Sequence, residues 1–191
     1  MYRMKLSDSE ILEQIQSGKK LLYSQIVEKY KEQAMTLALR VLKNREDAEE
    51  AIQDAFIRAY NALDKFERRS KFSTWLYRIV YNVCLSHLSK KNRNIDFVRE
   101  DDNVDTSEEI YPIISTGNEY EKNELIALIQ TTIEELPEKY GIMLSLFYFQ
   151  ELSYEEICDV TRLPLGTVKT HLFRARSLLL KRLAEQYAIT A

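Results

Sequence analysis

The C-terminal part of this chain contains one stretch whose pattern predicts its fold, Ser153-Tyr-Glu-Glu-Ile-Cys-Asp-Val-Thr-Arg-Leu-Pro-Leu-Gly-Thr-Val-Lys-Thr-His-Leu172. Ser153 followed three residues later by Glu156 is the pattern of a capping box, which predicts a short helix over residues 154–160. A turn over residues 162–166 follows, and a second helix begins at Gly166-Thr167 and runs past Leu183. This arrangement predicts a helix-turn-helix, whose second helix enters the major groove of DNA.

The second helix of this motif has an apolar side and a basic side. Between residues 165 and 183 there are five bases and no acid, whereas the preceding segment is acidic. Because acids are repelled by phosphates, the second helix is the one predicted to touch DNA. The alternative is an amphipathic helix whose basic side is merely solvated. The apolar seam consists of Val168, Leu172, Ala175, Leu179 and Leu183; the opposite side carries Thr167, Thr170, Arg174, Ser177 and Lys181, flanked by Lys169 and Arg176.

Outward from this motif, the composition predicts an all-α protein of two small helical domains joined by a flexible acidic linker. The 191 residues include only four glycines and three prolines, which favours long helices over a turn-rich β fold. Residues 96–124 carry ten acids and two bases, while residues 1–95 carry 12 acids and 18 bases. We therefore expect an N-terminal domain over residues 1–95, a linker over residues 96–122 and a C-terminal domain over residues 123–191.

The N-terminal part shows three apolar stripes at helical spacing, over residues 22–41, 48–63 and 72–88. Asn44 is the expected N-cap of the second of these helices. That helix also carries a purely acidic run, defined here as Glu46, Asp47, Glu49, Glu50 and Asp54. The run either complements the helix dipole and is solvated, or forms a docking surface for a basic protein.

Residues 65–93 combine eight bases and one acid with interleaved aromatic side chains. Cations that follow phosphates, together with rings that stack on bases, suit single-stranded or melted nucleic acid. For Phe72 and Trp75 we favour the simpler interpretation that they are core residues. The side chains that precede the stripe are expected to be exposed in a loop; they are Phe66, Arg68, Arg69 and Lys71.

Together these motifs resemble the bacterial RNA polymerase sigma factors of the extracytoplasmic-function type, in the sigma-70 family. The resemblance is carried by Asp47-Ala-Glu-Glu-Ala-Ile-Gln-Asp-Ala-Phe-Ile-Arg-Ala-Tyr60, by Lys71-Phe-Ser-Thr-Trp-Leu-Tyr-Arg-Ile79 with Asn82, and by Leu136-Pro-Glu-Lys-Tyr140 through Leu152-Ser-Tyr-Glu-Glu-Ile157 to Phe173-Arg-Ala-Arg176. It implies a protein that joins core RNA polymerase, directs it to a promoter and opens the minus-ten element.

The resemblance also implies roles for individual residues. Docking on the clamp helices of the largest polymerase subunit would map onto Asp47, Glu49, Glu50, Gln53 and Asp54. Minus-ten recognition, with a flipped base held by the loop, would map onto Phe66, Arg68, Arg69, Lys71, Arg78 and Asn82. Minus-35 recognition would map onto Thr167, Lys169, Thr170, Phe173, Arg174 and Arg176. Further expected partners are the polymerase flap and an anti-sigma factor. The acidic residues 96–109 could occupy the RNA path of the polymerase.

Two places depart from the family pattern. Lys71 stands where the family has a glycine, and Ser86, His87 and Ser89 stand where it has an aspartate and an arginine. These changes bear on which minus-ten sequence the chain prefers.

An alternative interpretation is an ordinary activator or repressor that uses the same helix-turn-helix.

An enzyme is not expected, because no Walker loop, HExxH motif or metal-spaced set of acids is present. We expect no cofactor and no metal. His87 and His171 are expected on the surface or facing DNA, and Cys84 and Cys158 in the core. The first ten residues lack the apolar segment of a signal peptide, and no run is long enough to span a bilayer. The expected location is the cytoplasm, on nucleoid DNA or tethered to the membrane through an anti-sigma factor.

Overall fold

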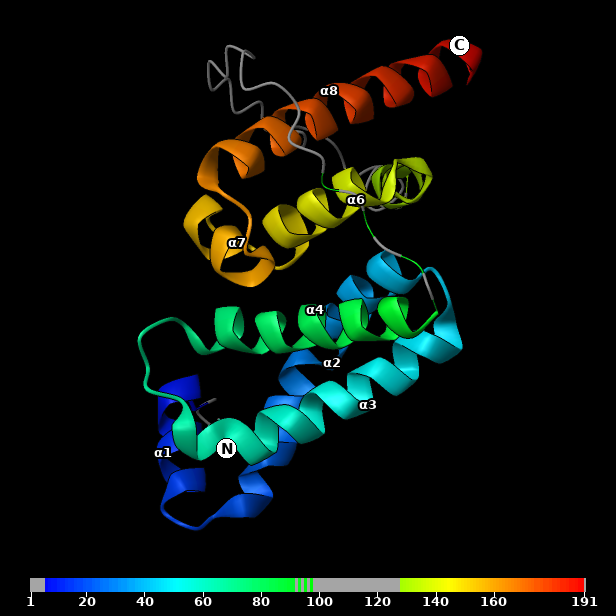
Figure 1. The fold of residues 1–191 in the computed structure, drawn as a ribbon. Helices are drawn as coiled ribbons and strands as arrows, with labels where there is room; N and C mark the ends of the chain where they lie inside the picture. The colour runs from blue at the N-terminus through cyan, green and yellow to red at the C-terminus, as the bar shows by residue number, and fades with distance from the viewer. Residues whose placement is uncertain (1–5, 92, 94, 96, 98–127, 191) are drawn as a thin grey trace, which may run out of the picture. The chain divides into compact units, whose positions relative to one another are not determined.

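The computed structural model describes residues 6–91, 93, 95, 97 and 128–190, and these divide between two compact units. All regular elements within these residues are helical, so the predicted all-α fold class is confirmed (Figure 1). The predicted acidic linker, 96–122, lies outside the described residues except for Phe97. None of the described helices is both long enough and apolar enough to cross a lipid bilayer.

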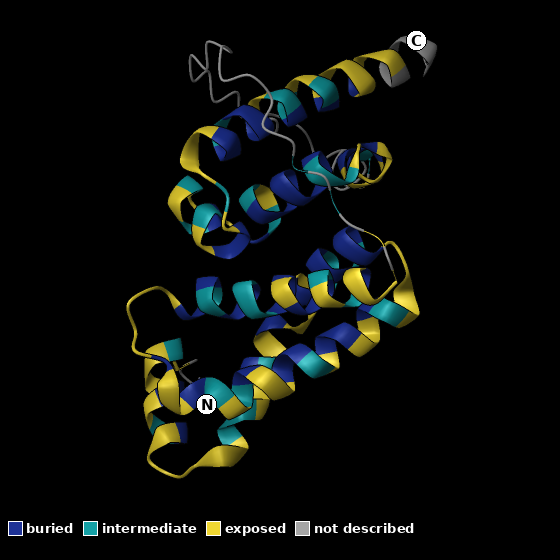
Figure 2. Cartoon of the chain, viewed as in Figure 1, coloured by how far each residue is buried: buried dark blue, intermediate teal, exposed yellow. Residues whose placement is uncertain are grey.

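The first unit is a bundle in which α2 (Tyr23–Leu42), α3 (Arg45–Ala62) and α4 (Phe72–Lys90) pack against one another. α1 (Asp8–Gln16) and the short 3₁₀ turns η1 (Lys20–Leu22) and η2 (Leu63–Lys65) complete it. Each of the three long helices turns one buried face inward (Figure 2). The apolar stripes predicted for α2 and α3 supply their faces; among their fully buried members are Ile26, Leu37, Ala48 and Ala55. On α4 the predicted Trp75 and Ile79 are only half-buried, and the neighbouring Leu76 and Val80 are fully buried instead.

Local signals explain where the helices of this unit begin and end. Lys43 adopts a left-handed conformation, with φ 55°, and ends α2. The next residue, Asn44, accepts a hydrogen bond from the backbone N–H of Asp47 at 2.9 Å, which confirms the predicted N-cap of α3. α1 begins with a reciprocal capping box between Ser7 and Glu10. This helix was not among those predicted from the sequence.

The second unit contains a helix over residues 128–135, α6 (Glu138–Leu144), α7 (Tyr154–Thr161) and α8 (Leu165–Thr190). After α6, residues Ser145–Phe149 form a π-helical turn, in which the N–H of Gln150 bonds the carbonyl of Ser145. α6 approaches the preceding helix closely at Gly141, where a Cβ atom would lie 3.3 Å from the carbonyl oxygen of Ile133. A larger residue there would push the two helices apart.

The helix-turn-helix forms as the sequence predicts. Ser153 and Glu156 make the reciprocal capping box that starts α7, and Arg162, with φ 64°, ends it. The short turn then leads into α8, which packs on α6. All five members of the predicted apolar seam of α8 are buried, from Val168 to Leu183.

Candidate nucleic-acid interfaces

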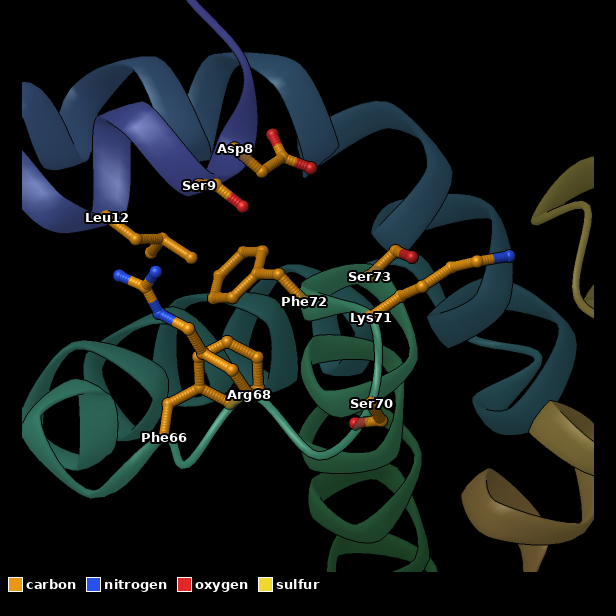
Figure 3. A pocket seen from close by; sticks show the side chains of 9 residues that line it. All are labelled: Asp8, Ser9, Leu12, Phe66, Arg68, Ser70, Lys71, Phe72 and Ser73. Atoms are coloured by element: carbon orange, nitrogen blue, oxygen red, sulfur yellow. The ribbon is translucent and has the colours of Figure 1, made fainter.

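A pocket of about 310 Å³ opens in the first unit between α1 and the loop over residues 66–71 that precedes α4 (Figure 3). Three different segments build it, so no single stretch of sequence contains the site. α1 supplies Asp8, Ser9 and Leu12; the loop supplies Phe66, Arg68, Ser70 and Lys71; and the start of α4 supplies Phe72 and Ser73.

Three aromatic rings form one cluster beside this pocket. The ring centroid of Phe66 lies 5.6 Å from that of Phe72 and 5.1 Å from that of Trp75. Phe66 is therefore only 8% exposed, so the expectation of an exposed ring in the loop was wrong. The loop folds back so that this ring buries its apolar surface against α4. Phe72 is buried, as favoured from the sequence, while Trp75 is half-buried.

Arg68 fastens the loop to α1. Its backbone has φ 56°, and its guanidinium donates to Glu13 at 2.8 Å and to Gln16 at 3.4 Å. The neighbouring Arg69 is exposed and pairs with Glu67 at 2.7 Å. Both arginines lie at the protein surface as expected, but Arg68 is oriented by an ion pair before any nucleic acid arrives.

A polar stripe runs from the pocket along α4. Lys71, Arg78 and Asn82 recur at spacings of seven and four residues, which places them on one side of the helix. Lys71 and Asn82 are exposed and Arg78 is half-buried. The exposed Ser86 and Ser89 continue the same side. Of the six predicted minus-ten residues, Phe66, Arg68 and Lys71 line the pocket, whereas Arg78 and Asn82 lie further along α4.

The acidic run on α3 is largely paired with cations of the same unit. Asp47 bonds Lys91 at 2.6 Å, and its side chain is only 18% exposed. Glu49 pairs with Arg45 and Asp54 with Arg58, each one helical turn away. The run therefore presents less negative charge than its sequence suggests.

On the outward side of α3, Glu50 and Gln53 are exposed next to Ile57, one turn further along. Ile57 is 61% exposed, which is unusual for an isoleucine in a small bundle. The apolar stripe of α3 leaves Ile57 out, so an isoleucine off the stripe was the signal that could have identified this position.

The exposed side of α8 differs from the predicted one. Thr167 and Thr170 are only 8% and 5% exposed, and His171 is fully buried, so their expected exposure was wrong. The ring of His171 lies 5.9 Å from that of Tyr140 on α6 and 5.7 Å from that of Phe97. Neighbouring elements therefore widen the buried side of α8 beyond its apolar seam. Burial, together with Lys139, lowers the pKa of His171.

The side of α8 that remains open carries the exposed Phe173, with Lys169 and Arg174 half-buried beside it. Lys169 and Phe173 are one turn apart, and Leu165 and Ser177 extend the line in both directions. Phe173 and Leu165 are 36% and 40% exposed. Three of the six predicted minus-35 residues therefore lie on an accessible surface in the described structure.

Arg176 occupies a cage of aromatic side chains instead of the open side. Its Nε donates to the hydroxyl of Tyr148 at 3.1 Å, and its Nη1 donates to the hydroxyl of Tyr154 at 3.2 Å. The guanidinium carbon also lies 4.8 Å from the ring centroid of Phe147. Arg176 thereby joins α8 to the π-helical turn and to α7, so its expected placement on the DNA-facing surface was wrong.

Side chains suited to metal binding do not gather anywhere in the described parts of the chain. Cys84 is buried, as expected, and burial raises the pKa of its thiol to about 12, which keeps it protonated. Cys158 is only half-buried.

Two family models match the chain, one in each unit. Sigma-70 region 2 matches residues 26–94, and sigma-70 region 4 matches residues 126–179. The chain is 35% identical over 180 residues to the RNA polymerase sigma-H factor of Pseudomonas aeruginosa, covering 92% of this chain and 93% of that protein. It is 34% identical over 186 residues to the ECF RNA polymerase sigma factor SigW of Bacillus subtilis, covering 95% and 100%.

Two solved structures share the fold. One is CnrH in complex with the cytosolic domain of CnrY, with a TM-score of 0.62, 22% identity, and coverage of 93% of this chain and 97% of that one. The other is the sigma factor RpoE in complex with the anti-sigma factor NepR from Bartonella quintana, with a TM-score of 0.62, 22% identity, and coverage of 85% and 96%.

Proposed function

This chain belongs to the sigma-70 family, in its extracytoplasmic-function group, and we propose from that premise how its two units divide the recognition of a promoter. As a sigma factor it directs RNA polymerase to promoters. The first unit takes the melted minus-ten element, and α8 of the second unit takes the minus-35 element. Each unit offers few contacts, so polymerase would make them effective by holding both at the right spacing.

The observation that carries the minus-ten assignment is the pocket between α1 and the loop over residues 66–71. Its volume of about 310 Å³ is large enough for one flipped nucleobase. Leu12 and Phe72 line it with only 2% and 5% of their surface exposed, and Arg68 and Lys71 place positive charge at its loop side. Stacking and apolar burial of a base return about 1–3 kcal/mol, which offsets much of the cost of unstacking it.

For the minus-35 element, we assign the contacts to Lys169, Phe173 and Arg174 on the open side of α8. Lysine and arginine can bond phosphates or the guanine edge, and the phenylalanine ring can contact a thymine methyl group. Thr167 and Thr170 would reach DNA only through backbone contacts near the start of the helix, since their side chains are buried.

We assign core polymerase docking to the outward side of α3, where Glu50, Gln53 and Ile57 are exposed together. An exposed apolar side chain rimmed by polar groups is typical of a protein interface. The described residues hold no metal-binding cluster, and we propose that the chain acts by binding and not by catalysis. Because polymerase and nucleoid DNA would be its partners, we place it in the cytoplasm.

An anti-sigma factor that covers the same side of α3 would hold the protein inactive. The RpoE structure named above is a complex with the anti-sigma factor NepR, which supports this proposal. Core polymerase should displace a partner of this kind, and Ile57→Asp should weaken the binding of both. The acidic residues 96–109 remain a proposal for the RNA path, and they lie outside the described residues.

Run-off transcription with purified core polymerase tests the proposed function. The full-length chain should permit initiation at discrete sites on a genomic fragment library, whereas an activator or repressor would not. Ser9→Phe should fill the pocket and abolish promoter opening, measured by permanganate reactivity, while leaving polymerase binding intact. Ser24→Phe, an exposed site on α2, is the matched control. Normal opening by Ser9→Phe would show that the pocket does not hold the base.

A further inference from the structure

Helix α1 lies before residue 26, where the sigma-70 region 2 match begins, and no role was predicted for it from the sequence. Two of its side chains contact the loop over residues 66–71. We propose that Glu13 and Gln16 are positioning residues for minus-ten recognition, which hold this loop in its folded conformation through Arg68. Arg68 then serves recognition by fixing the loop and not by touching DNA. The inference rests on the proposed function, in which the first unit takes the melted minus-ten element.

The backbone of Arg68 needs support from its surroundings. Its φ of 56° lies in the left-handed region, which a residue with a Cβ atom rarely adopts. Such a conformation persists only where neighbouring contacts hold it. The guanidinium makes these contacts on α1, where Nη1 donates to Glu13 Oε1 at 2.8 Å and Nη2 donates to Gln16 Oε1 at 3.4 Å. The side chain of Arg68 therefore ties the strained point of the loop to α1.

The amide of Gln16 also contacts the turn that leads into the loop. While its Oε1 accepts from Arg68, its Nε2 donates to the carbonyl oxygen of Leu63 at 3.4 Å. The same carbonyl oxygen accepts the backbone N–H of Phe66 at 3.1 Å, at the end of η2. One side chain of α1 thus bridges the turn before the loop and the middle of the loop. Glu13 lies three positions earlier, on the same side of the helix.

The pairing with Glu13 leaves Arg68 poorly placed to bind a phosphate. Both terminal nitrogens of the guanidinium are engaged by α1, and the carboxylate beside them repels an anion. Figure 3 shows the Arg68 side chain extending to the α1 wall of the pocket, next to Leu12. A phosphate could take the place of Glu13 only by breaking the contact that holds the loop.

Exposure limits the strength of each contact. The side chains of Arg68 and Glu13 are 41% and 62% exposed, and an ion pair of this kind is weak in water. Reversing the charge of one partner does more than remove the pair, because it places two like charges at the same spot. Charge reversal should therefore make opening of the loop about fivefold more frequent.

Hydrogen exchange of the full-length chain measures loop opening directly. Peptic peptides over residues 64–72 report on the loop and contain the bonded amide of Phe66. In Glu13→Arg and in Arg68→Glu, these peptides should exchange about fivefold faster than in the wild type. Gln16→Ala, which removes both amide contacts, should also speed the exchange, and an unchanged rate would remove Gln16 from the assignment. In all three variants promoter opening, measured by permanganate reactivity, should fall while polymerase binding is unchanged.

A charge swap separates positioning from direct contact with DNA. The double variant Glu13→Arg, Arg68→Glu restores an ion pair between the same two positions but leaves no cation at position 68. We expect it to return both loop exchange and promoter opening to near the wild-type values. Glu28→Arg is the matched control, because Glu28 is also an exposed acid paired with a cation, Lys31, but lies on α2. It should change neither readout.

The outcomes separate this inference from the function on which it rests. Unchanged loop exchange in both single charge variants would show that α1 does not hold the loop, and faster exchange with normal promoter opening would show that the contacts do not serve recognition. If the double variant regains slow exchange but not promoter opening, Arg68 contacts DNA itself and the inference fails. Normal promoter opening by Ser9→Phe would instead overturn the pocket assignment, while the exchange rates would still decide whether α1 holds the loop.

Discussion

Replacement of Arg176 by alanine is expected to destabilise the second unit, because the guanidinium holds three segments together. It donates hydrogen bonds to Tyr148 in the π-helical turn and to Tyr154 at the start of α7, and it lies over the ring of Phe147. Alanine would remove all of these contacts at once and leave both tyrosine hydroxyls without this donor.

The size of the effect follows from the contacts. Each hydrogen bond is worth about 1 kcal/mol at a half-exposed site. The cation–π contact at 4.8 Å adds about 1 kcal/mol. The expected loss is therefore about 3 kcal/mol of unfolding free energy in the second unit, a large share of the stability of a small domain. Tyr154→Phe keeps the ring and removes one hydrogen bond, so it should cost about 1 kcal/mol.

Urea unfolding of the full-length chain can measure each unit separately. Trp75 is the single tryptophan and lies in α4, so tryptophan fluorescence follows the first unit, while circular dichroism follows both. Arg176→Ala should lower the urea midpoint of the second unit, which circular dichroism detects, and should leave the midpoint of the first unit, which fluorescence detects, unchanged. Lys181→Ala, an exposed cation on the same helix, is the matched control and should move neither. An unchanged transition combined with altered promoter selectivity would refute the structural role.

Three further predictions concern the same unit. Arg174→Ala should weaken binding of the holoenzyme to its promoter by about 1–3 kcal/mol, and unchanged affinity and selectivity in a DNA titration would exclude Arg174 as a contact. Ser153→Ala should lower the unfolding free energy of the second unit by about 1 kcal/mol, because Ser153 Oγ caps the N–H of Glu156 at 3.2 Å; an unshifted urea midpoint would contradict this. Burial, then Lys139, lowers the pKa of His171, so the unfolded chain takes up the His171 proton at higher pH than the folded chain. The unfolding free energy should therefore be highest above the ordinary histidine pKa of about 6.5 and should fall as the pH drops through that value. In His171→Asn, urea midpoints measured across this pH range should lack this decrease.

The sequence predicted those features that depend on neighbours along the chain. The apolar seam of α8 and the caps at Asn44 and Ser153 involve residues within a few turns of one another, so helical spacing was sufficient. The same reasoning could have found α1. Ser7 and Glu10 form a capping box of the same type, and the apolar Ile11 and Leu12 follow immediately.

Exposure on a helix could not be predicted in the same way, because elements distant in sequence decide it. Thr170 and His171 lie outside the apolar seam of α8, and helical spacing placed them on its accessible side. The rings of Tyr140 and Phe97, which belong to other segments, lie against His171 and enlarge the buried side. Phe66 was misplaced for the same reason, since its burial depends on Phe72 and Trp75 across a loop.

The two arginines of the Phe173-Arg-Ala-Arg176 stretch illustrate what this means for DNA recognition. A bidentate contact to guanine requires two N–H groups on one edge of the guanidinium. Arg176 already uses Nε, which belongs to one such edge, and Nη1, which belongs to the other, on tyrosines that are 28 and 22 residues away in sequence, so each edge has a nitrogen engaged inside the fold. Identical side chains two positions apart therefore have different tasks. A basic face counted from sequence overstates the number of DNA contacts, and minus-35 selectivity in this chain should depend on Lys169, Phe173 and Arg174.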